Sequence, residues 1–337
     1  MRARRGFTFL ELLIAVAVIA GLVGIMLPAL GKSRAMARQI KDSAQIRGCG
    51  QGLVLFAQNN QDVYPLPSLI DKGDLTIRLA AGEDAGLKDQ TKNIFSILVF
   101  GAFFGPEICV STAESNGDIV TDLNYEYSEP KAAMGRDKKL AIWDPAFKGP
   151  PSAGYQGCNA KDPGNVSYAH SMPFGGRKKS WSSTFVATEV ILGNRGAWYE
   201  LQGGASGTWK LSGEVPKDAM HYPQGARPAT VSNTLLIHGG RTTWEGNIAY
   251  NDNHVNFETR PDPETSPFTF ASLDPAHRTM FDNLFANEND KARSPDADSL
   301  AGGDGPDKNV NNYLRMYAGG KAAGGTMVDL KGAWFAD

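Results

Sequence analysis

Cysteine is scarce in this chain of 337 residues, and its three copies form no paired motif. Cys49, Cys109 and Cys158 are too far apart for a C-x-x-C pair, so zinc and thioredoxin-type chemistry have little support. The odd count leaves at least one thiol unpaired within a monomer. Outside the cytoplasm one disulfide is permitted, and Cys109 with Cys158 is our first choice, although sequence alone does not fix connectivity.

The chain also lacks strong charge and the usual catalytic spacings. Its net charge of -2 and pI near 6.2 give no sign of a nucleic-acid surface, so we expect no nucleic-acid partner. It contains no H-E-x-x-H, no G-x-S-x-G and no P-loop, and no repeat of fixed period. We therefore expect a protein without a catalytic role of its own and without a required cofactor.

Turn-forming residues are abundant, with 38 Gly and 19 Pro in the whole chain. This composition favours short strands joined by turns over a helical bundle. The expected elements of the body follow from β-branched runs, apolar runs and turn signals. They are strands at Glu107–Val110, Thr184–Leu192 and Thr230–His238, a hairpin at Gly246–Thr259, a buried helix within Asn93–Phe104 and a helix near Pro275–Asn287.

One long apolar run stands at the N-terminus, from Phe7 to Leu30. A helix of this length spans about 36 Å, against a hydrocarbon core of roughly 30 Å, so it can cross a bilayer. Arginines precede the run and Lys32, Arg34 and Arg38 follow it, which makes the positive-inside rule less decisive. The short N-terminus and the large polar body still favour an N-terminus inside and a body outside.

Three interpretations of this run compete, and Glu11 separates them. A secretory signal peptide is disfavoured by the length of the run, by Glu11 and by the lack of a clear small-x-small cleavage site. A plain anchor would carry an unpaired carboxylate, which costs on the order of 2.5–3.5 kcal/mol at the centre of a bilayer. Nothing else in the segment is expected to supply Glu11 with a partner.

The third interpretation supplies that partner. The stretch Arg5-Gly6-Phe7-Thr8-Phe9-Leu10-Glu11 resembles the leader and N-terminus of type IV pilins and type II secretion pseudopilins. The resemblance implies cleavage by prepilin peptidase between Gly6 and Phe7, and N-methylation of Phe7. It makes Glu11 the fifth residue after the cut, which would pair with the terminal amine of Phe7 on a neighbouring subunit. Pro28 falls where pilins commonly carry a helix-kinking proline.

The same resemblance implies partners and a location. The partners are other pilin-like subunits, the prepilin peptidase and methyltransferase, the inner-membrane assembly machinery and membrane lipid. The location is the bacterial inner membrane, crossed once, with the N-terminus cytoplasmic and the body periplasmic or extracellular.

Beyond the membrane the helical pattern continues in amphipathic form. Met36, Ile40 and Ala44 recur at four-residue spacing, and Ile46, Cys49, Leu53 and Phe56 then recur at three and four. Three glycines, at 48, 50 and 52, predict a bend or break in this second half, and polar residues 58–62 predict its end.

Two further stretches resemble the large pilin-like proteins of planctomycete-type bacteria. They are Ser33–Arg38 with Asn60–Pro65, and His238-Gly239-Gly240 with the following strand and turn. In that second stretch the gap is longer than usual and Asn253 stands where Gly is usual, so no role is carried over to His238. In such proteins the helix lies on an antiparallel sheet.

We therefore predict an α+β fold, in which a long N-terminal helix with a transmembrane and an amphipathic half packs on an antiparallel β-sheet body with long loops. The divisions are a leader at 1–6, a transmembrane helix at 7–30, its amphipathic continuation at 31–62 and an extracytoplasmic body at 63–337.

Calcium binding has a sequence argument in one acidic region near the C-terminus. Four carboxylates in a polar segment could offer oxygen ligands, namely Asp296, Asp298, Asp304 and Asp307. Major pseudopilins often hold calcium in a C-terminal loop, which this segment resembles in position. The spacing is not that of an EF-hand, and a solvated loop is the alternative.

The sequence thus favours a structural subunit of a type IV pilus-like or type II secretion pseudopilus filament. The alternative is a membrane-anchored extracytoplasmic binding module or enzyme that uses the pilin-like N-terminus only for sorting.

Overall fold

The computed structural model describes residues 7–83, 85–149, 151, 163–213, 229–295, 309–323 and 326–332. Of residues 318–332 it describes the strands alone, without their side chains. The chain divides into two compact units, Met1–Lys41 and Asp42–Asp337. The second unit, here called the body, therefore begins inside the long N-terminal helix rather than after it.

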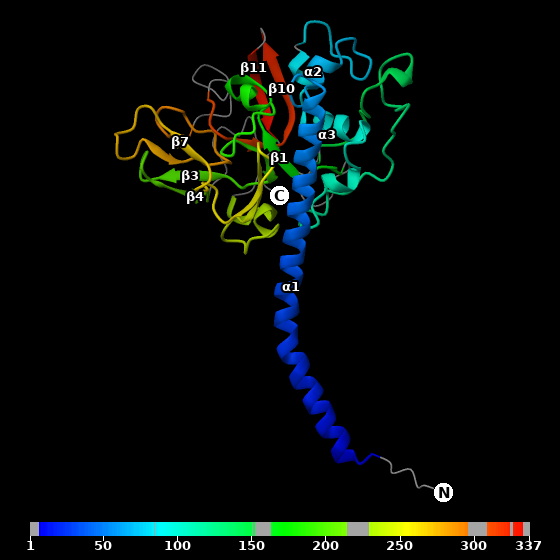
Figure 1. Ribbon diagram of the computed structural model, residues 1–337, viewed down its shortest axis with the longest axis vertical. Helices are drawn as coiled ribbons and strands as arrows, with labels where there is room; N and C mark the ends of the chain where they lie inside the picture. The colour runs from blue at the N-terminus through cyan, green and yellow to red at the C-terminus, as the bar shows by residue number, and fades with distance from the viewer. Residues whose placement is uncertain are drawn as a thin grey trace. The chain divides into compact units, whose positions relative to one another are not determined.

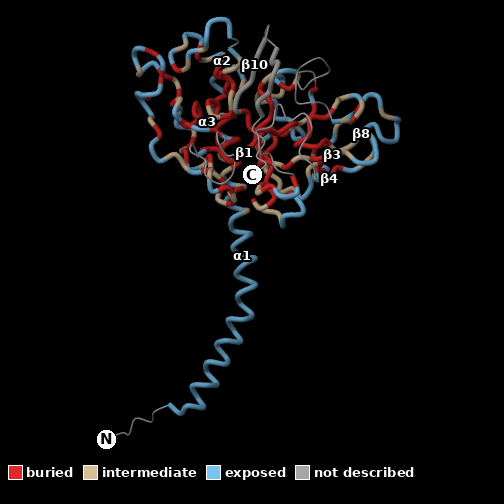
Figure 2. The backbone as a smooth tube through the Cα atoms, turned by 180° about the vertical axis from the view of Figure 1, so that it is seen from behind, coloured by how far each residue is buried: buried red, intermediate tan, exposed pale blue. Residues whose placement is uncertain are grey.

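Helix α1 extends from Phe9 to Gln58 and continues through Pro28 (Figure 1). It is the one helix among the described residues that is long and apolar enough to cross a membrane. Its residues in the first unit are almost all exposed (Figure 2), as expected for a segment whose solvent is lipid. The helix ends where predicted, at Gln58, and the next turn closes with left-handed backbone at Gln61 and Asp62.

The body is built on an antiparallel sheet of five strands, in the order β6-β5-β2-β1-β9. These strands are β1 (Tyr168–Ser171), β2 (Val190–Asn194), β5 (Gly246–Tyr250), β6 (Val255–Glu258) and β9 (Leu314–Arg315). Together with α1 they confirm the predicted α+β class. The predicted hairpin is also confirmed, because β5 pairs with β6 and Asn253 adopts the left-handed turn conformation with φ 65°.

The remaining elements are short. The helices are α2 (Pro67–Ile70) and α3 (Thr91–Phe100), and the latter confirms the predicted buried helix. Three two-stranded hairpins complete the set: β3 (Tyr199–Gln202) with β4 (Thr208–Leu211), β7 (Pro267–Thr269) with β8 (Thr279–Phe281), and β10 (Tyr317–Ala323) with β11 (Thr326–Gly332).

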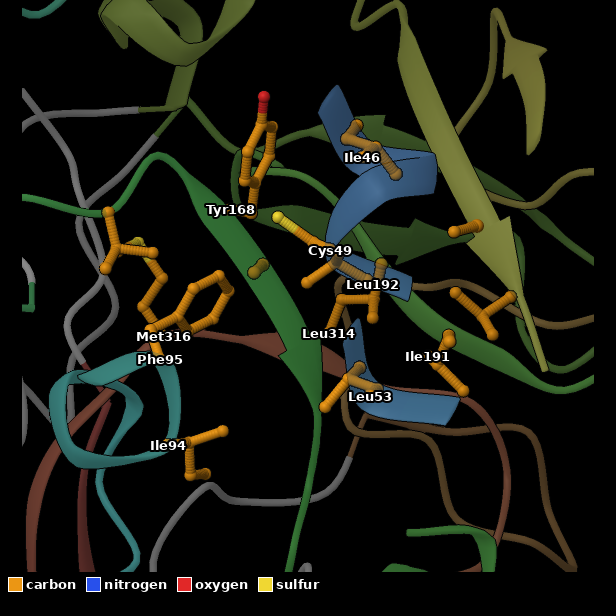
Figure 3. Close-up of a cluster of buried hydrophobic side chains, with 14 of the residues drawn as sticks. Ile46, Cys49, Leu53, Ile94, Phe95, Tyr168, Ile191, Leu192, Leu314 and Met316 are labelled. Atoms are coloured by element: carbon orange, nitrogen blue, oxygen red, sulfur yellow. The ribbon is translucent and has the colours of Figure 1, made fainter. Parts of the chain in front are cut away.

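The core forms where the last part of α1 meets the sheet and α3 (Figure 3). The predicted stripe is buried there, since Ile46, Cys49, Leu53 and Phe56 are all at most 8 % exposed. Leu192 from the sheet and Phe95 from α3 belong to the same cluster. Met36 and Ile40 of the predicted stripe, in contrast, are exposed in the first unit.

Several predicted elements were wrong, because local side-chain hydrogen bonds replaced the strand or helix pattern. The predicted strand Thr230–His238 is a pair of 3₁₀ turns, where the hydroxyl of Ser232 accepts from the N–H of Thr234. The predicted strand Glu107–Val110 is largely a 3₁₀ turn that begins at Pro106, a residue suited to a helical first turn.

The predicted strand Thr184–Leu192 begins only at Val190. Phe185 before it has φ 57°, outside the β region. The predicted helix near Pro275–Asn287 is absent from these described residues: β8 occupies its middle, and the carboxylate of Glu288 accepts from the N–H of Asn283.

The three glycines of the helix do not break it, which corrects the predicted break. Instead, two of them leave room for neighbouring groups. A Cβ at Gly52 would lie 2.6 Å from the ring of Phe104, and one at Gly50 would lie 2.5 Å from the amide oxygen of Asn253. At Gly48 the nearest atom, on Ile108, would be 3.8 Å away, an ordinary contact.

These distances predict opposite effects for two alanine substitutions on one helix. Gly52→Ala should lower the free energy of unfolding by about 1–3 kcal/mol, because the buried Phe104 ring must move. Gly48→Ala should raise it by about 0.5–1 kcal/mol through helix propensity. Urea titration of both variants measures this difference, and equal stability of the two would contradict the close packing at Gly52.

Candidate functional site

The first turn of α1 closes on itself through Thr8 and Glu11. One carboxylate oxygen of Glu11 accepts the backbone N–H and the hydroxyl of Thr8, each at 2.8 Å. The Thr8 hydroxyl oxygen in turn accepts the N–H of Glu11 at 3.2 Å. This reciprocal arrangement is a capping box, which satisfies N–H groups that a helix start leaves without partners.

The capping box corrects the expectation that nothing in the segment could serve Glu11. Thr8 provides hydrogen bonds, but it provides no positive charge. In an apolar setting the carboxylate therefore still favours a cation from outside its own helix. Phe7, next to this turn, is 88 % exposed, while Gly6 lies outside the described residues.

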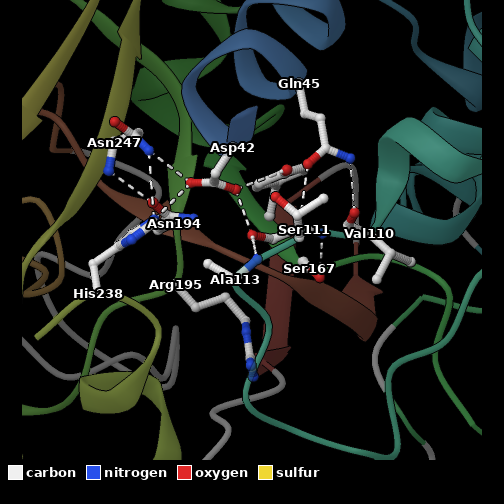
Figure 4. Close-up of polar contacts among 12 residues, drawn as sticks. Asp42, Gln45, Val110, Ser111, Ala113, Ser167, Asn194, Arg195, His238 and Asn247 are labelled. Atoms are coloured by element: carbon white, nitrogen blue, oxygen red, sulfur yellow. Dashed lines mark hydrogen bonds and ion pairs between the residues drawn. The ribbon is translucent and has the colours of Figure 1, made fainter. Parts of the chain in front are cut away.

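A second polar site surrounds Asp42, the first residue of the body (Figure 4). Its side chain is fully buried and accepts hydrogen bonds from four groups. Asn247 of β5 donates at 2.7 Å, Tyr168 of β1 donates at 3.0 Å, and Ser111 donates a short bond. The imidazole Nε2 of His238 lies 2.9 Å from Oδ2, the oxygen that also accepts from Asn247, whereas Tyr168 and Ser111 donate to Oδ1. We call these five residues the Asp42 centre.

Electrostatics favour the ionised form of Asp42. Burial alone would raise the pKa of Asp42, but hydrogen bonds from His238, Ser111 and Asn247 outweigh burial and lower it. Burial raises the pKa of Tyr168, and the Asp42 charge raises it further. The same two causes raise the pKa of the Cys49 thiol. An ionised carboxylate among neutral hydroxyl and thiol groups suits structure better than nucleophilic chemistry.

Gln45, one turn further along α1, holds the loop beside Cys109. Its amide donates to the carbonyls of Glu107 and Val110 at 3.2 and 3.0 Å, and its oxygen accepts the N–H of Thr112 at 3.1 Å. Cys109 is fully buried, and the disulfide predicted for it stays a prediction. Its predicted partner, Cys158, lies outside the described residues.

His170 of β1 is a buried histidine of the core. Its Nε2 lies 2.9 Å from the hydroxyl of Thr91 and its Nδ1 lies 2.8 Å from the carbonyl of Ser171. Burial lowers its pKa to about 4, although the bond to Ser171 acts in the opposite direction. The imidazole is therefore neutral in the folded chain at neutral pH.

This histidine predicts acid sensitivity of the fold. The unfolded chain binds a proton near pH 6.5 and the folded chain only near pH 4, so acid in this window favours unfolding. The stability that is lost between these values amounts to ~3 kcal/mol at most. Urea titrations at several pH values should show a flatter pH dependence for His170→Gln than for wild type. A wild-type slope in His170→Gln would contradict the assignment.

No metal site can be assigned in the part of the chain that the structure describes. No three His, Cys, Asp or Glu side chains there gather closely enough to hold an ion. The four predicted calcium ligands, Asp296, Asp298, Asp304 and Asp307, lie outside the described residues. Calcium binding by them stays a prediction.

Comparison with known families matches one part of the chain. Residues 1–27 match the model of the prokaryotic N-terminal methylation motif. The chain begins with a prepilin-type signature. This is the cleavage and methylation signature of type IV pilin-like proteins, and it supports a pilin-like or pseudopilin-type precursor. Comparison with curated proteins and with solved structures gave no match.

Together with the apolar part of α1, the prepilin-type signature indicates a membrane-anchored protein. It also implies processing by prepilin peptidase and assembly with other pilin subunits. The resemblance read from Gly6, Phe7 and Glu11 is therefore confirmed at the level of the signature.

The sequence analysis missed the polar roles of Thr8 and Asp42, although signals for both existed. The pattern Thr-x-x-Glu at the start of an apolar helix, here Thr8 and Glu11, is the capping-box signature. Asp42 stands four residues before Ile46, on the same face as the buried stripe, and a carboxylate at such a position requires polar partners. Asn247 and His238, which provide them, had no signal that connected them to the helix.

Proposed function

We propose that this chain is a structural subunit of a type IV pilus-like or type II secretion pseudopilus filament. Prepilin peptidase would cut between Gly6 and Phe7, and Phe7 would be N-methylated. The observation that carries the proposal is the methylation motif at residues 1–27, in which Glu11 is the fifth residue after that junction. The new ammonium of Phe7 on one subunit would meet the Glu11 carboxylate of the next.

The structure supports this assembly role in two ways. The capping box orders the first turn of the helix, so that Glu11 is presented in a defined geometry. The Asp42 centre and the core hold residues 42–58 of α1 in the body, so force on the helix reaches the body through a buried attachment. A filament subunit requires no catalytic chemistry. In this role the body would lie outside the cytoplasm.

The alternative function is an anchored extracytoplasmic binding module that uses the prepilin-type signature for sorting. One observation favours it: a groove of about 420 Å³ lies beside the end of α1 and α2. Asn59, Asn60, Tyr64 and Leu69 are among the residues that line it. Amide and apolar groups of this kind suit ligand binding.

Mass spectrometry of the N-terminus of the mature chain, isolated from its own membranes, tests the processing step. We expect N-methylated Phe7 as the first residue. An intact Met1 would contradict processing, and a start near Lys32 would show that the apolar run is a cleaved signal peptide.

A further inference from the structure

A stripe of positive charge follows the membrane-length part of α1. Residues 12–41 contain no Asp or Glu, and the four charged side chains among them are Lys32, Arg34, Arg38 and Lys41. Arg34, Arg38 and Lys41 are spaced by four and three residues, so they lie on one face of the helix. We call the four residues the basic collar.

The basic collar begins at the depth of lipid headgroups. From Phe9 to Leu30 the helix covers roughly 33 Å, slightly more than a hydrocarbon core of about 30 Å. Arg34 then stands roughly 6 Å, and Lys41 roughly 16 Å, beyond Leu30 along the axis. Long basic side chains extend back toward the interface, so Lys32, Arg34 and Arg38 are within reach of phosphate groups, and Lys41 adds positive charge just beyond them.

No carboxylate lies beside these side chains within residues 12–41 of the helix itself. All four collar residues are exposed, and none of the described ion pairs includes one of them. Asp42, the next carboxylate along the helix, already accepts hydrogen bonds from four groups of the body. In a second copy at the same depth, the helix again offers no acidic partner, because residues 12–41 are identical.

Cleavage of the leader would leave the basic side chains at one end of the span only. The proposed cut after Gly6 removes Arg2, Arg4 and Arg5 from the other side of the span. The mature helix then has basic side chains only at the end where it leaves the membrane. After cleavage, the charged groups that set the depth of the helix in the bilayer are the basic collar, the terminal ammonium and Glu11.

We propose that the basic collar binds the phosphate groups of anionic phospholipids at the C-terminal end of the span and fixes the depth of the helix in the bilayer. The inference rests on the membrane-spanning part of the proposed function, not on filament assembly. An acidic surface on another protein is the other partner with suitable charge. Lipid is favoured because the collar lies at headgroup depth and because copies of this helix have no carboxylate there.

Native mass spectrometry of the full chain in lipid nanodiscs tests the proposal. In nanodiscs of equal parts phosphatidylglycerol and phosphatidylcholine, wild type should retain phosphatidylglycerol in preference by at least about fivefold. Arg34→Gln/Arg38→Gln/Lys41→Gln should retain the two lipids nearly equally, whereas Arg34→Lys/Arg38→Lys should keep the preference. These residues are exposed, so the substitutions leave the packed body intact.

A matched control removes the same charge elsewhere. Lys72→Gln/Lys178→Gln/Lys179→Gln neutralises three exposed lysines of the body and should keep the wild-type preference. An equal loss in this control, an unchanged preference in the collar variant, or no preference in wild type would each overturn the proposal. A chain that fails to enter nanodiscs at all would instead contradict the membrane span, so the two failures are distinguishable.

Discussion

Replacing Asp42 with alanine should lower the free energy of unfolding of the body by about 3–5 kcal/mol. The substitution removes the acceptor shared by Asn247, Tyr168, Ser111 and His238. Each buried polar group without a partner costs free energy, so the loss exceeds that of a single hydrogen bond. Urea unfolding followed by the fluorescence of the buried Trp143, Trp181 and Trp244 measures the change.

A surface carboxylate provides the control for this prediction. The side chain of Glu129 is 57 % exposed and makes a single long ion pair, so Glu129→Ala should change stability by less than about 0.5 kcal/mol. A double-mutant cycle with Asp42→Ala and His238→Ala should show coupling of more than about 1 kcal/mol. Additive effects of these two substitutions, or an Asp42→Ala variant as stable as Glu129→Ala, would contradict a shared buried network.

The second large effect concerns assembly rather than stability. Glu11→Ala should be processed normally and yet fail to enter filaments or to cross-link with wild-type copies, because the ammonium of Phe7 loses its carboxylate. Cells that express the variant beside wild type provide the assay: the sheared filament fraction is compared with the membrane fraction by mass spectrometry. We expect incorporation to fall by at least tenfold, which corresponds to about 1.4 kcal/mol of assembly free energy.

Two neighbouring variants separate the charge of Glu11 from its role in the capping box. Glu11→Gln keeps an acceptor for Thr8 but has no charge, so it should fail as alanine does. Thr8→Ala keeps the charge and loses the hydroxyl, at a cost of about 1 kcal/mol of helix stability, and should still enter filaments. Normal incorporation of Glu11→Gln together with failure of Thr8→Ala would show that the cap, not the charge, is what assembly requires.

The sequence predicted those parts of the fold that local pattern determines. The apolar run, the stripe of Ile46, Cys49 and Leu53, and the end of the helix at Gln58 follow from periodicity and from terminating residues. The β5–β6 hairpin follows from its alternation and its Asn-Asp-Asn turn. Each of these features depends on residues close to one another in the chain.

The predictions that were wrong concern features that depend on contacts between residues far apart in the chain. The glycines at 50 and 52 reduce helix propensity, but packing against Asn253 and Phe104 gives them a place in an unbroken helix. The Asp42 centre brings together residues from 42 to 247, a juxtaposition that no local pattern encodes. Helix propensity contributes only a small free energy per residue, and tertiary packing outweighs it at such positions.

The measurement that tests the central claim most directly is peptide mass spectrometry of filaments sheared from cells that produce this chain. We expect the chain in the filament fraction, with N-methylated Phe7 as its first residue there. Recovery of the chain solely from the membrane fraction, or with Met1 intact, would contradict its role as a processed filament subunit.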